Sequence, residues 1–196
     1  MQEHYFFEAH KEWDLARRKA FWSRILADVQ GKDIGLLDFA DIAHRLHLDN
    51  AVYQGTQTIP LDKIVGSEDR YHDFTRAFLP LNQELRERWS NIATLYLDPM
   101  SSGVPPIEVY KVGDSYFVKD GNHRVSVARQ LAFEDIEAYV WEFTPPAGFG
   151  EPDADLKTLL CEAEHREFLA KTWLDELRPD HNLVLTQPCG YLDLLR

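Results

Sequence analysis

The fold is decided by residues 107–128, which read IEVYKVGDSYFVKDGNHRVSVA. Two runs within this stretch, residues 107–111 and 115–119, are rich in β-branched and aromatic residues. Between them lies Val112-Gly113-Asp114, which has the composition of a tight turn. Two such runs separated by a short glycine-containing loop predict an antiparallel β-hairpin.

The second strand of this hairpin passes directly into a helix. Asp120-Gly121 breaks the strand pattern, and residues 124–131 follow with the apolar spacing of a mostly buried helix. The first turn of a helix leaves backbone N–H groups unpaired, and the helix dipole adds partial positive charge there. A strand that ends in Asp-Gly and turns into a helix therefore predicts a phosphate-binding site.

The side chains of this loop suit phosphate chemistry. Gly121 permits unusual backbone angles and the close approach of a ligand. Arg124 offers a planar fork of donors for phosphate oxygens, and His123 donates to phosphate or exchanges a proton near neutral pH. Asn122 supplies a donor and an acceptor, and Ser126 adds a hydroxyl in the first helical turn. These residues are the candidate phosphate ligands.

Asp120 lies at the mouth of the same loop, where a carboxylate would repel bound phosphates unless it had a task. One task is to hold Mg²⁺, which also screens the repulsion. Another is to orient or deprotonate an attacking hydroxyl, which would make Asp120 and His123 the catalytic candidates. The competing interpretation is an ordinary Asp-Gly turn with Arg124 in a surface salt bridge.

The rest of the chain alternates between helical and strand-like patterns, so the fold class predicted is α+β. We expect helices in residues 1–50 (the second one over 37–46, with Asp38 near its start), 81–95 and 153–178. We expect strands at 58–61, 136–143 and 183–185, a loop running into a short helix over 66–78, and a helix-like end at 191–196.

Composition limits the function classes. The chain has 196 residues and a net charge of −12, which argues against non-specific DNA binding because that needs clustered Lys and Arg. A basic cluster around Arg17 is expected to be a solvated helix face. No apolar run approaches the roughly 20 residues needed to cross a bilayer, and the start of the chain is too polar for a secretory signal. Cys161 and Cys189 are expected to be packing residues, with a reducing cytoplasm as the default location.

Three motifs, in order, resemble the ParB/sulfiredoxin superfamily. They are Ile59-Pro60-Leu61-Asp62-Lys63-Ile64-Val65, then Pro105-Pro106-Ile107-Glu108-Val109, then Tyr116-Phe117-Val118-Lys119-Asp120-Gly121-Asn122-His123-Arg124 with the helix after it. The loop Asp-Gly-Asn-His-Arg is most similar to that of the ADP-dependent free serine kinases. The resemblance implies a small mixed sheet with packed helices. It divides the chain into an N-terminal helical segment (1–55), a nucleotide-binding domain (56–145), and a linker with a C-terminal helical segment (146–196).

The resemblance implies that CTP, ATP or ADP lies with its phosphates on residues 121–124, with Mg²⁺ bound through Asp120. It also brings the segment after the first strand close to the loop, which makes Glu68, Arg70 and Tyr71 further candidates. Asn122 replaces the nucleophilic cysteine of sulfiredoxins, and Arg124 stands where ParB proteins have two arginines. Sulfinic acid reduction and centromere binding are therefore not expected.

Two functions remain open at this point. One is a Mg²⁺-dependent nucleotide phosphotransferase or hydrolase, in which Arg124 and the loop amides stabilise charge in the transition state. The other is a nucleotide-switched or DNA-associated regulatory module that performs no chemistry. A nucleotide is the expected partner in both, a protein partner or homodimer is open, and no membrane association is expected.

Overall fold

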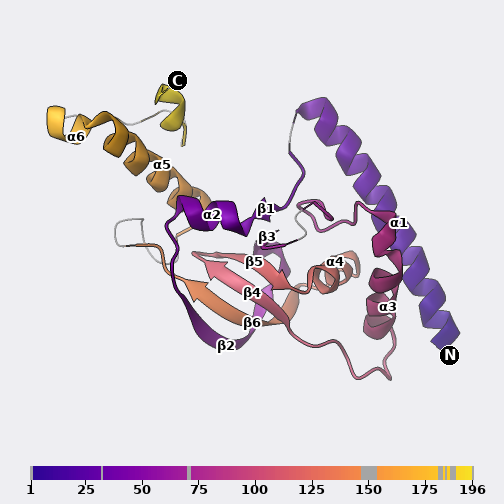
Figure 1. The fold of residues 1–196 in the computed structure, drawn as a ribbon. Coiled ribbons are helices and arrows are strands. Elements are labelled where there is room, and N and C mark those ends of the chain that lie inside the picture. Colours follow the sequence, from indigo (N-terminus) through magenta and orange to yellow (C-terminus); the bar gives the residue numbers. More distant parts are fainter. Residues whose placement is uncertain are drawn as a thin grey trace.

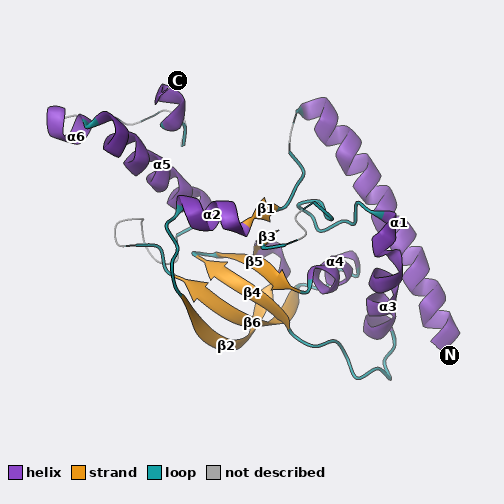
Figure 2. Cartoon of the chain, viewed as in Figure 1, coloured by secondary structure: helices purple, strands orange, loops and turns teal. Residues whose placement is uncertain are grey.

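The computed structural model describes residues 2–31, 33–69, 72–146, 154–180, 183, 185 and 189–195. It confirms the α+β class, with one mixed sheet and helices packed on it (Figures 1 and 2). The strands are β1 (Leu37–Asp38), β2 (Ala51–Pro60), β3 (Ile64–Ser67), β4 (Ile107–Val112), β5 (Ser115–Asp120) and β6 (Asp135–Phe143). The α-helices are α1 (Gln2–Gln30), α2 (Phe39–Arg45), α3 (Arg86–Leu97), α4 (Asn122–Gln130), α5 (Leu156–Thr172) and α6 (Leu174–Leu177). Short 3-10 turns cover Leu61–Lys63, Gln83–Leu85 and Leu192–Leu195.

The strand order in the sheet is β1-β3-β5-β4-β6-β2. β1, β3 and β5 are parallel, whereas β4 pairs with β5 as the predicted antiparallel hairpin. β6 is parallel to β4, and β2 closes the far edge antiparallel to β6. The carboxyl ends of β3 and β5 therefore meet at the same edge of the sheet.

Successive residues of the central strands point to opposite faces and so build two cores. Val118 of β5 faces a core shared with α1, α3 and α4, where Trp13 and Trp89 are fully buried. Phe117, its neighbour, faces a second core formed with α2 and α5, which includes Phe39 and Leu159. α1 contributes to the first core by packing on α3, where the Trp13 ring meets that of Trp89, so the N-terminal helix shares a core with the predicted nucleotide-binding segment.

Several predicted elements are confirmed, and others differ in extent. The second helix is present, and the Asp38 side chain caps it by accepting from the Ala40 N–H at 2.9 Å. The strand expected at 58–61 begins earlier, at Ala51, and runs through the expected boundary at residue 56. The first four residues of β2 are all exposed, so no alternation of buried and exposed positions marks them as a strand. The predicted strand 136–143 is confirmed as β6.

Two local predictions are wrong. The described part of residues 66–78 contains no helix: it opens in β3 and continues in turns held by backbone bonds such as Phe78 N–H to Thr75 O at 2.7 Å. Leu183 and Leu185 do not lie in a strand, and Val184 lies outside the described residues. Both stretches contain apolar residues, but too few of them to distinguish the periodicity of a helix from that of a strand.

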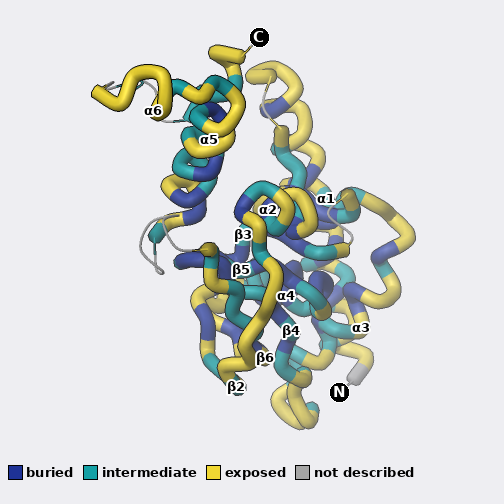
Figure 3. Tube along the Cα trace, turned by 60° about the vertical axis from the view of Figure 1, so that its left-hand side comes forward, coloured by how far each residue is buried: buried dark blue, intermediate teal, exposed yellow. Residues whose placement is uncertain are grey.

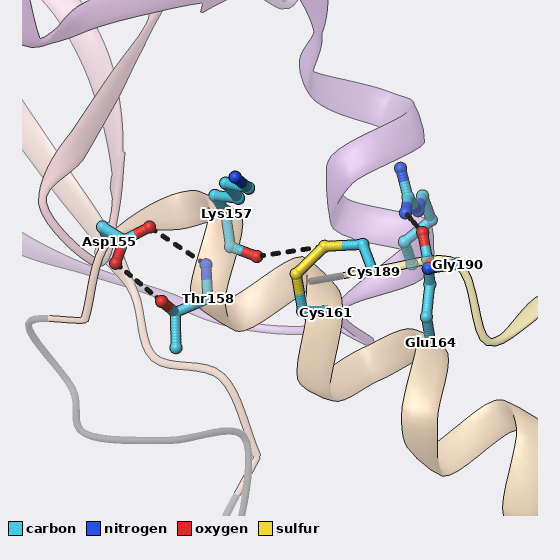
Figure 4. Close-up of a disulfide and its surroundings, with 8 residues drawn as sticks. Asp155, Lys157, Thr158, Cys161, Glu164, Cys189 and Gly190 are labelled. Atoms are coloured by element: carbon cyan, nitrogen blue, oxygen red, sulfur yellow. Dashed lines mark hydrogen bonds and ion pairs between the residues drawn. A yellow bond between two sulfur atoms is a disulfide. The ribbon is translucent and has the colours of Figure 1, made fainter. Parts of the chain in front are cut away.

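The cysteines also differ from expectation, because Cys161 and Cys189 form a disulfide (Figure 4). Cys161 lies on α5, and Cys189 belongs to the segment before the last turn of the chain. Beside the disulfide, the Gly190 N–H donates to Glu164 Oε2 at 2.9 Å, and Glu164 Oε1 accepts from Arg45 of α2 at 2.7 Å. The C-terminal segment is thus tied to α5, and α5 to α2. The reducing location expected from the cysteines stays a prediction.

Within the described ranges, no helix is both long enough and apolar enough to span a bilayer.

Arg129 joins α4 to the connections around it. Its Nη2 donates to the carbonyls of Leu61 and of Ile64, the latter at 2.8 Å, and its guanidinium lies 4.9 Å from the centre of the Phe78 ring. Burial lowers the pKa of Arg129, and nearby Asp62 opposes that shift. The side chain therefore fixes the position of α4 relative to β3 through partly buried bonds.

Replacement of Arg129 by methionine keeps the apolar stem and removes the donors. We expect a loss of about 1.5–3 kcal/mol in the free energy of unfolding, because hydrogen bonds to charged groups contribute that much and the carbonyls of Leu61, Ile64 and Arg76 lose their donor. Urea denaturation measures the loss. Arg178→Met is the control at an exposed position, and it should change stability by less than about 0.5 kcal/mol. Equal effects of the two variants would contradict the role of Arg129.

Candidate functional site

A cleft of about 200 Å³ lies where β3 and β5 end. Asp69 follows β3, and Asp120 is the last residue of β5. Ser67 of β3 pairs in register with Val118 of β5, so the two acids lie at the same edge of the sheet. The described residues that line the cleft are Asp69, Arg88, Ile92, Lys119, Asp120, Gly121, Asn122, His123 and Arg124. Crevices at the carboxyl ends of parallel strands are where open α/β sheets bind ligands.

Gly121 forms the sharp turn between β5 and α4. Its φ is +115°, and a Cβ at this position would lie 2.5 Å from Ile107 Cγ2. Gly121 is the N-cap residue of α4 and has no side chain with which to cap the helix, whose first turn consists of residues 122–124. Those N–H groups have no partner within the helix. The loop thus presents an open helix amino end to the cleft, as the sequence predicted.

The environment of Asn122 indicates that the cleft binds a ligand. Its side chain lines the cleft although the residue is only 5% exposed, and its Oδ1 has no hydrogen-bond partner in the described structure. A buried polar atom left without a partner costs about 1–3 kcal/mol. A ligand that donates to this oxygen, or a cation that it coordinates, would recover that energy.

Arg124 also lines the cleft, but its donors are engaged by the protein. Nη1 donates to the carbonyls of Pro105 at 2.8 Å and Pro106 at 2.6 Å, and Nη2 forms an ion pair with Asp120. The Arg124 side chain is 12% exposed, whereas that of Asp120 is 61% exposed. In this arrangement Arg124 braces the loop, which agrees with the salt-bridge interpretation better than with a free phosphate ligand.

Tyr96 of α3 lies within the electrostatic reach of Arg124. Burial raises the pKa of Tyr96 to about 12, and the charge of Arg124 acts in the opposite direction. The Tyr96 hydroxyl is buried and has no hydrogen-bond partner among the described residues. Tyr96 therefore stays protonated across the physiological range.

Two of the predicted site residues point into the protein. His123 is 4% exposed, and its ring packs edge-on against Phe74 with 5.4 Å between centroids, although part of it reaches the cleft. Ser126 is 2% exposed, and its Oγ accepts a hydrogen bond from Trp89 Nε1 at 2.8 Å. Ser126 is not among the described residues that line the cleft, because it lies on the side of α4 that faces α3.

Of the second group of predicted residues, the structure describes only Glu68, which does not line the cleft. Glu68 Oε1 accepts from the Tyr110 hydroxyl at 3.4 Å and is not among the described lining residues. Burial raises the pKa of Tyr110 to about 12, and the Glu68 carboxylate adds to the shift. Arg70 and Tyr71 lie outside the described residues, so their prediction remains as it was.

Sequence reasoning missed Asp69 and Arg88. Asp69 directly follows the predicted site residue Glu68. Which of the two side chains faces the loop depends on the backbone conformation after β3, which the sequence does not give. Arg88 lies on α3, is exposed, and makes no hydrogen bond or ion pair within the described part of the chain. No motif marks it, because only the packing of α3 against α4 brings it to the cleft.

Lys119 lines the cleft but directs its charge elsewhere. Its Nζ forms an ion pair with Glu108 at 3.1 Å and lies 4.7 Å from the centre of the Trp141 ring. Both partners come from neighbouring strands of the sheet. Of Lys119 and Arg88, only Arg88 therefore has a charge at the cleft that no described residue engages.

Comparison with known proteins gives few matches. No family model matches the chain, and no curated protein matches it significantly. It is similar to the solved C2221 form of the Pnob8-like ParB-N domain, at 14% identity and a TM-score of 0.31, over 72% of this chain and 57% of that one. It is also similar to the pNOB8-like ParB N-domain, at 11% identity and a TM-score of 0.28, over 72% and 54%. The chain thus matches little more than half of each solved chain.

Proposed function

We propose that the protein binds a nucleotide through its phosphates at the amino end of α4. The observation that carries the proposal is the start of α4 at Gly121, whose first-turn N–H groups open onto the cleft. The buried, unpartnered Oδ1 of Asn122 is an acceptor, so it would take a cation bound with the phosphates. Helix amino ends attract anions through unpaired N–H groups and the helix dipole. The order of motifs that resembles nucleotide-binding proteins supports the same ligand class.

The phosphates would lie against the amides of residues 122–124, with Arg88 as the cation that reaches them. Arg88 is assigned this role because its charge is uncommitted, whereas Arg124 is held by Asp120 and two carbonyls. Arg124 then positions the loop. This division changes the sequence-based assignment, in which Arg124 alone gripped the phosphates.

Mg²⁺ fits the oxygens present. Asp69 and Asp120 bring two carboxylates to the cleft, and Asn122 brings an unpartnered amide oxygen. Mg²⁺ is commonly held by one or two carboxylates together with substrate phosphates and water. Bound there, the cation would screen the two carboxylates from a polyphosphate. Among the described residues no cluster of three or more His, Cys, Asp or Glu could hold a metal ion by itself.

Binding without catalysis is favoured by the state of the two catalytic candidates. The Asp120 carboxylate is paired with Arg124, and His123 is almost fully buried against Phe74. A general base needs access to the proton that it removes. Phosphotransfer or hydrolysis through Asp120 is the second candidate function, and it requires that the pair with Arg124 opens when the ligand binds.

Thermal unfolding with CTP, ATP, ADP and GTP, each with and without Mg²⁺, tests the proposal. A nucleotide at about 100 times its Kd should add roughly 2.7 kcal/mol to the free energy of unfolding. For a chain of this size each kcal/mol raises the melting temperature by about 2–4 °C. The shift should need Mg²⁺, and the absence of any shift with all four nucleotides would contradict the proposal.

Arg88→Ala should then lower nucleotide affinity by about 10- to 100-fold, because charge-assisted hydrogen bonds contribute about 1.5–3 kcal/mol. Arg178→Ala is the matched control: it removes the same charge from an exposed residue after α6, far from α4 (Figure 1). Asp120→Asn distinguishes the two functions. A binding module releases no phosphate before or after this change, whereas an enzyme loses turnover.

A further inference from the structure

α1 carries a row of exposed apolar side chains along its outer side, which we call the outer stripe. It consists of Phe7, Leu15, Trp22, Ile25 and Val29. Phe7, Trp22 and Val29 are 60%, 66% and 80% exposed, although large apolar residues usually avoid water. From Leu15 onward the intervals are seven, three and four residues, so these side chains share one side of the helix. Phe6, Phe21 and Leu26 are exposed beside them.

The rest of the protein uses the opposite side of α1. Ala9, Trp13, Ala16 and Ala20 are buried there, and the Trp13 ring meets that of Trp89 on α3 with 5.6 Å between centroids. α1 passes along α3 and extends well beyond it (Figure 1), and exposed positions recur along its length (Figure 3). The outer stripe is therefore not covered by any described part of the chain. Contiguous exposed apolar surface of this kind marks an interaction site.

The charges of α1 are separated along its axis. Residues 2–15 contain four acids and one lysine, for a net charge of −3. Residues 16–30 contain three arginines, one lysine and one aspartate, for a net charge of +3. A second α1 that runs in the opposite direction would place the acidic half of one helix beside the basic half of the other, although Arg17 is turned to the carbonyls of Pro80 and Leu81 in its own chain. In a parallel pair, like charges would face each other.

We propose that two copies of the chain pair through their outer stripes, with the two α1 helices antiparallel about a two-fold axis. The stripe extends from Phe7 to Val29, so its midpoint at Arg18 lies near the axis. Phe7 of one copy then lies opposite Val29 of the other. Arg18 lies about one helical turn from the partner's Asp14, which offsets the approach of the two arginines.

The size and charge of the surface favour a second copy over other partners. A helix of 29 residues is about 43 Å long, and a seam of this length with aromatic side chains can reach the roughly 1,000 Å² of a specific interface. An anionic membrane would repel the acidic half of a straight helix lying on it, and the whole chain carries a net charge of −12. In the antiparallel pair each half of α1 lies beside a half of opposite net charge.

Sedimentation equilibrium of the full chain between about 1 and 100 µM tests the pairing. We expect a mass twice that of the 22.8 kDa chain. Trp22→Glu and Ile25→Glu should each raise the dissociation constant at least about 30-fold, since large buried side chains dominate such interfaces. Met100→Glu is the control, because Met100 is 85% exposed and lies outside α1; it should leave the dimer unchanged. Circular dichroism confirms that each variant is folded.

Cross-linking tests the direction of the helices. In an antiparallel pair Arg18→Cys should form a disulfide between copies, whereas Phe7→Cys should form one only when mixed with Val29→Cys. Self-cross-linking of Phe7→Cys would overturn the antiparallel arrangement. A monomer at 100 µM would overturn the pairing itself, as would binding of the wild-type chain to anionic lipid vesicles that Trp22→Glu abolishes. None of these results depends on whether the cleft binds a nucleotide.

Discussion

Gly121→Ala is expected to destabilise the protein by about 2–5 kcal/mol and to abolish ligand binding at the cleft. A left-handed conformation costs an L-residue roughly 1–2 kcal/mol. The added methyl group would also lie 2.5 Å from Ile107 Cγ2 and 3.0 Å from Arg124 Nε. Ile107 is fully buried and cannot move aside without disturbing the core, which adds about 1–3 kcal/mol. Urea denaturation and thermal unfolding measure the loss.

Gly103 provides the control that separates the two causes. It also has positive φ, +77°, but nothing lies within 4 Å of a Cβ built there. Gly103→Ala should therefore cost only the backbone contribution, about 1–2 kcal/mol. If the two variants lose the same stability, the close approach of Gly121 to Ile107 does not constrain the loop, and the geometry of the cleft is less fixed than described.

Trp89→Ala is expected to cost about 3–5 kcal/mol, as large-to-small changes of buried aromatic residues do. Trp89 is fully buried where three helices meet: its ring contacts Trp13 of α1, and its Nε1 donates to Ser126 of α4 at 2.8 Å. The cavity would loosen α4 on the side opposite the cleft. Nucleotide affinity should fall with stability, although Trp89 is not among the described lining residues.

A double-mutant cycle separates the hydrogen bond from the packing. Trp89→Phe keeps most of the ring and removes the donor, and Ser126→Ala removes the acceptor. Each single change leaves a buried polar group unpaired, at a cost of about 1–3 kcal/mol, whereas the double variant leaves none. The double variant should therefore be more stable than the sum of the single losses implies. Additive losses would mean that the Trp89–Ser126 bond contributes nothing.

The central part of the fold could be predicted from sequence because its signals are local. The hairpin 107–119 and the helix after Gly121 follow from alternation, turn composition and a helical period in consecutive residues. The segment 66–78 could not be predicted in this way. Its turns are set by contacts with residues distant in sequence, such as the bond from Arg76 N–H to Ile34 O. The pairing of Cys161 with Cys189 likewise depends on how the C-terminal segment meets α5.

The same distinction applies to the cleft. The loop residues are adjacent in sequence, so their common location was predictable, and the uncapped helix start follows from Asp-Gly itself. The environment of each side chain was not predictable. Ser126 faces Trp89 because helical geometry turns it away from the loop, and Arg124 reaches Pro105 and Pro106 because β4 lies beside β5. Arg88 lies on α3 and not on the loop, and no local sequence pattern predicts that it lines the cleft.

The bonds of Arg124 also couple ligand binding at the cleft to the conformation of the chain before β4. The guanidinium divides its donors between Asp120, at the mouth of the cleft, and the carbonyls of Pro105 and Pro106. A ligand that competes for the Asp120 carboxylate changes the free energy with which this connection is held. By thermodynamic reciprocity, a partner that grips the connection changes affinity at the cleft by the same factor. The connection from α3 to β4 therefore links the two elements and also affects how much of the cleft is occupied by ligand.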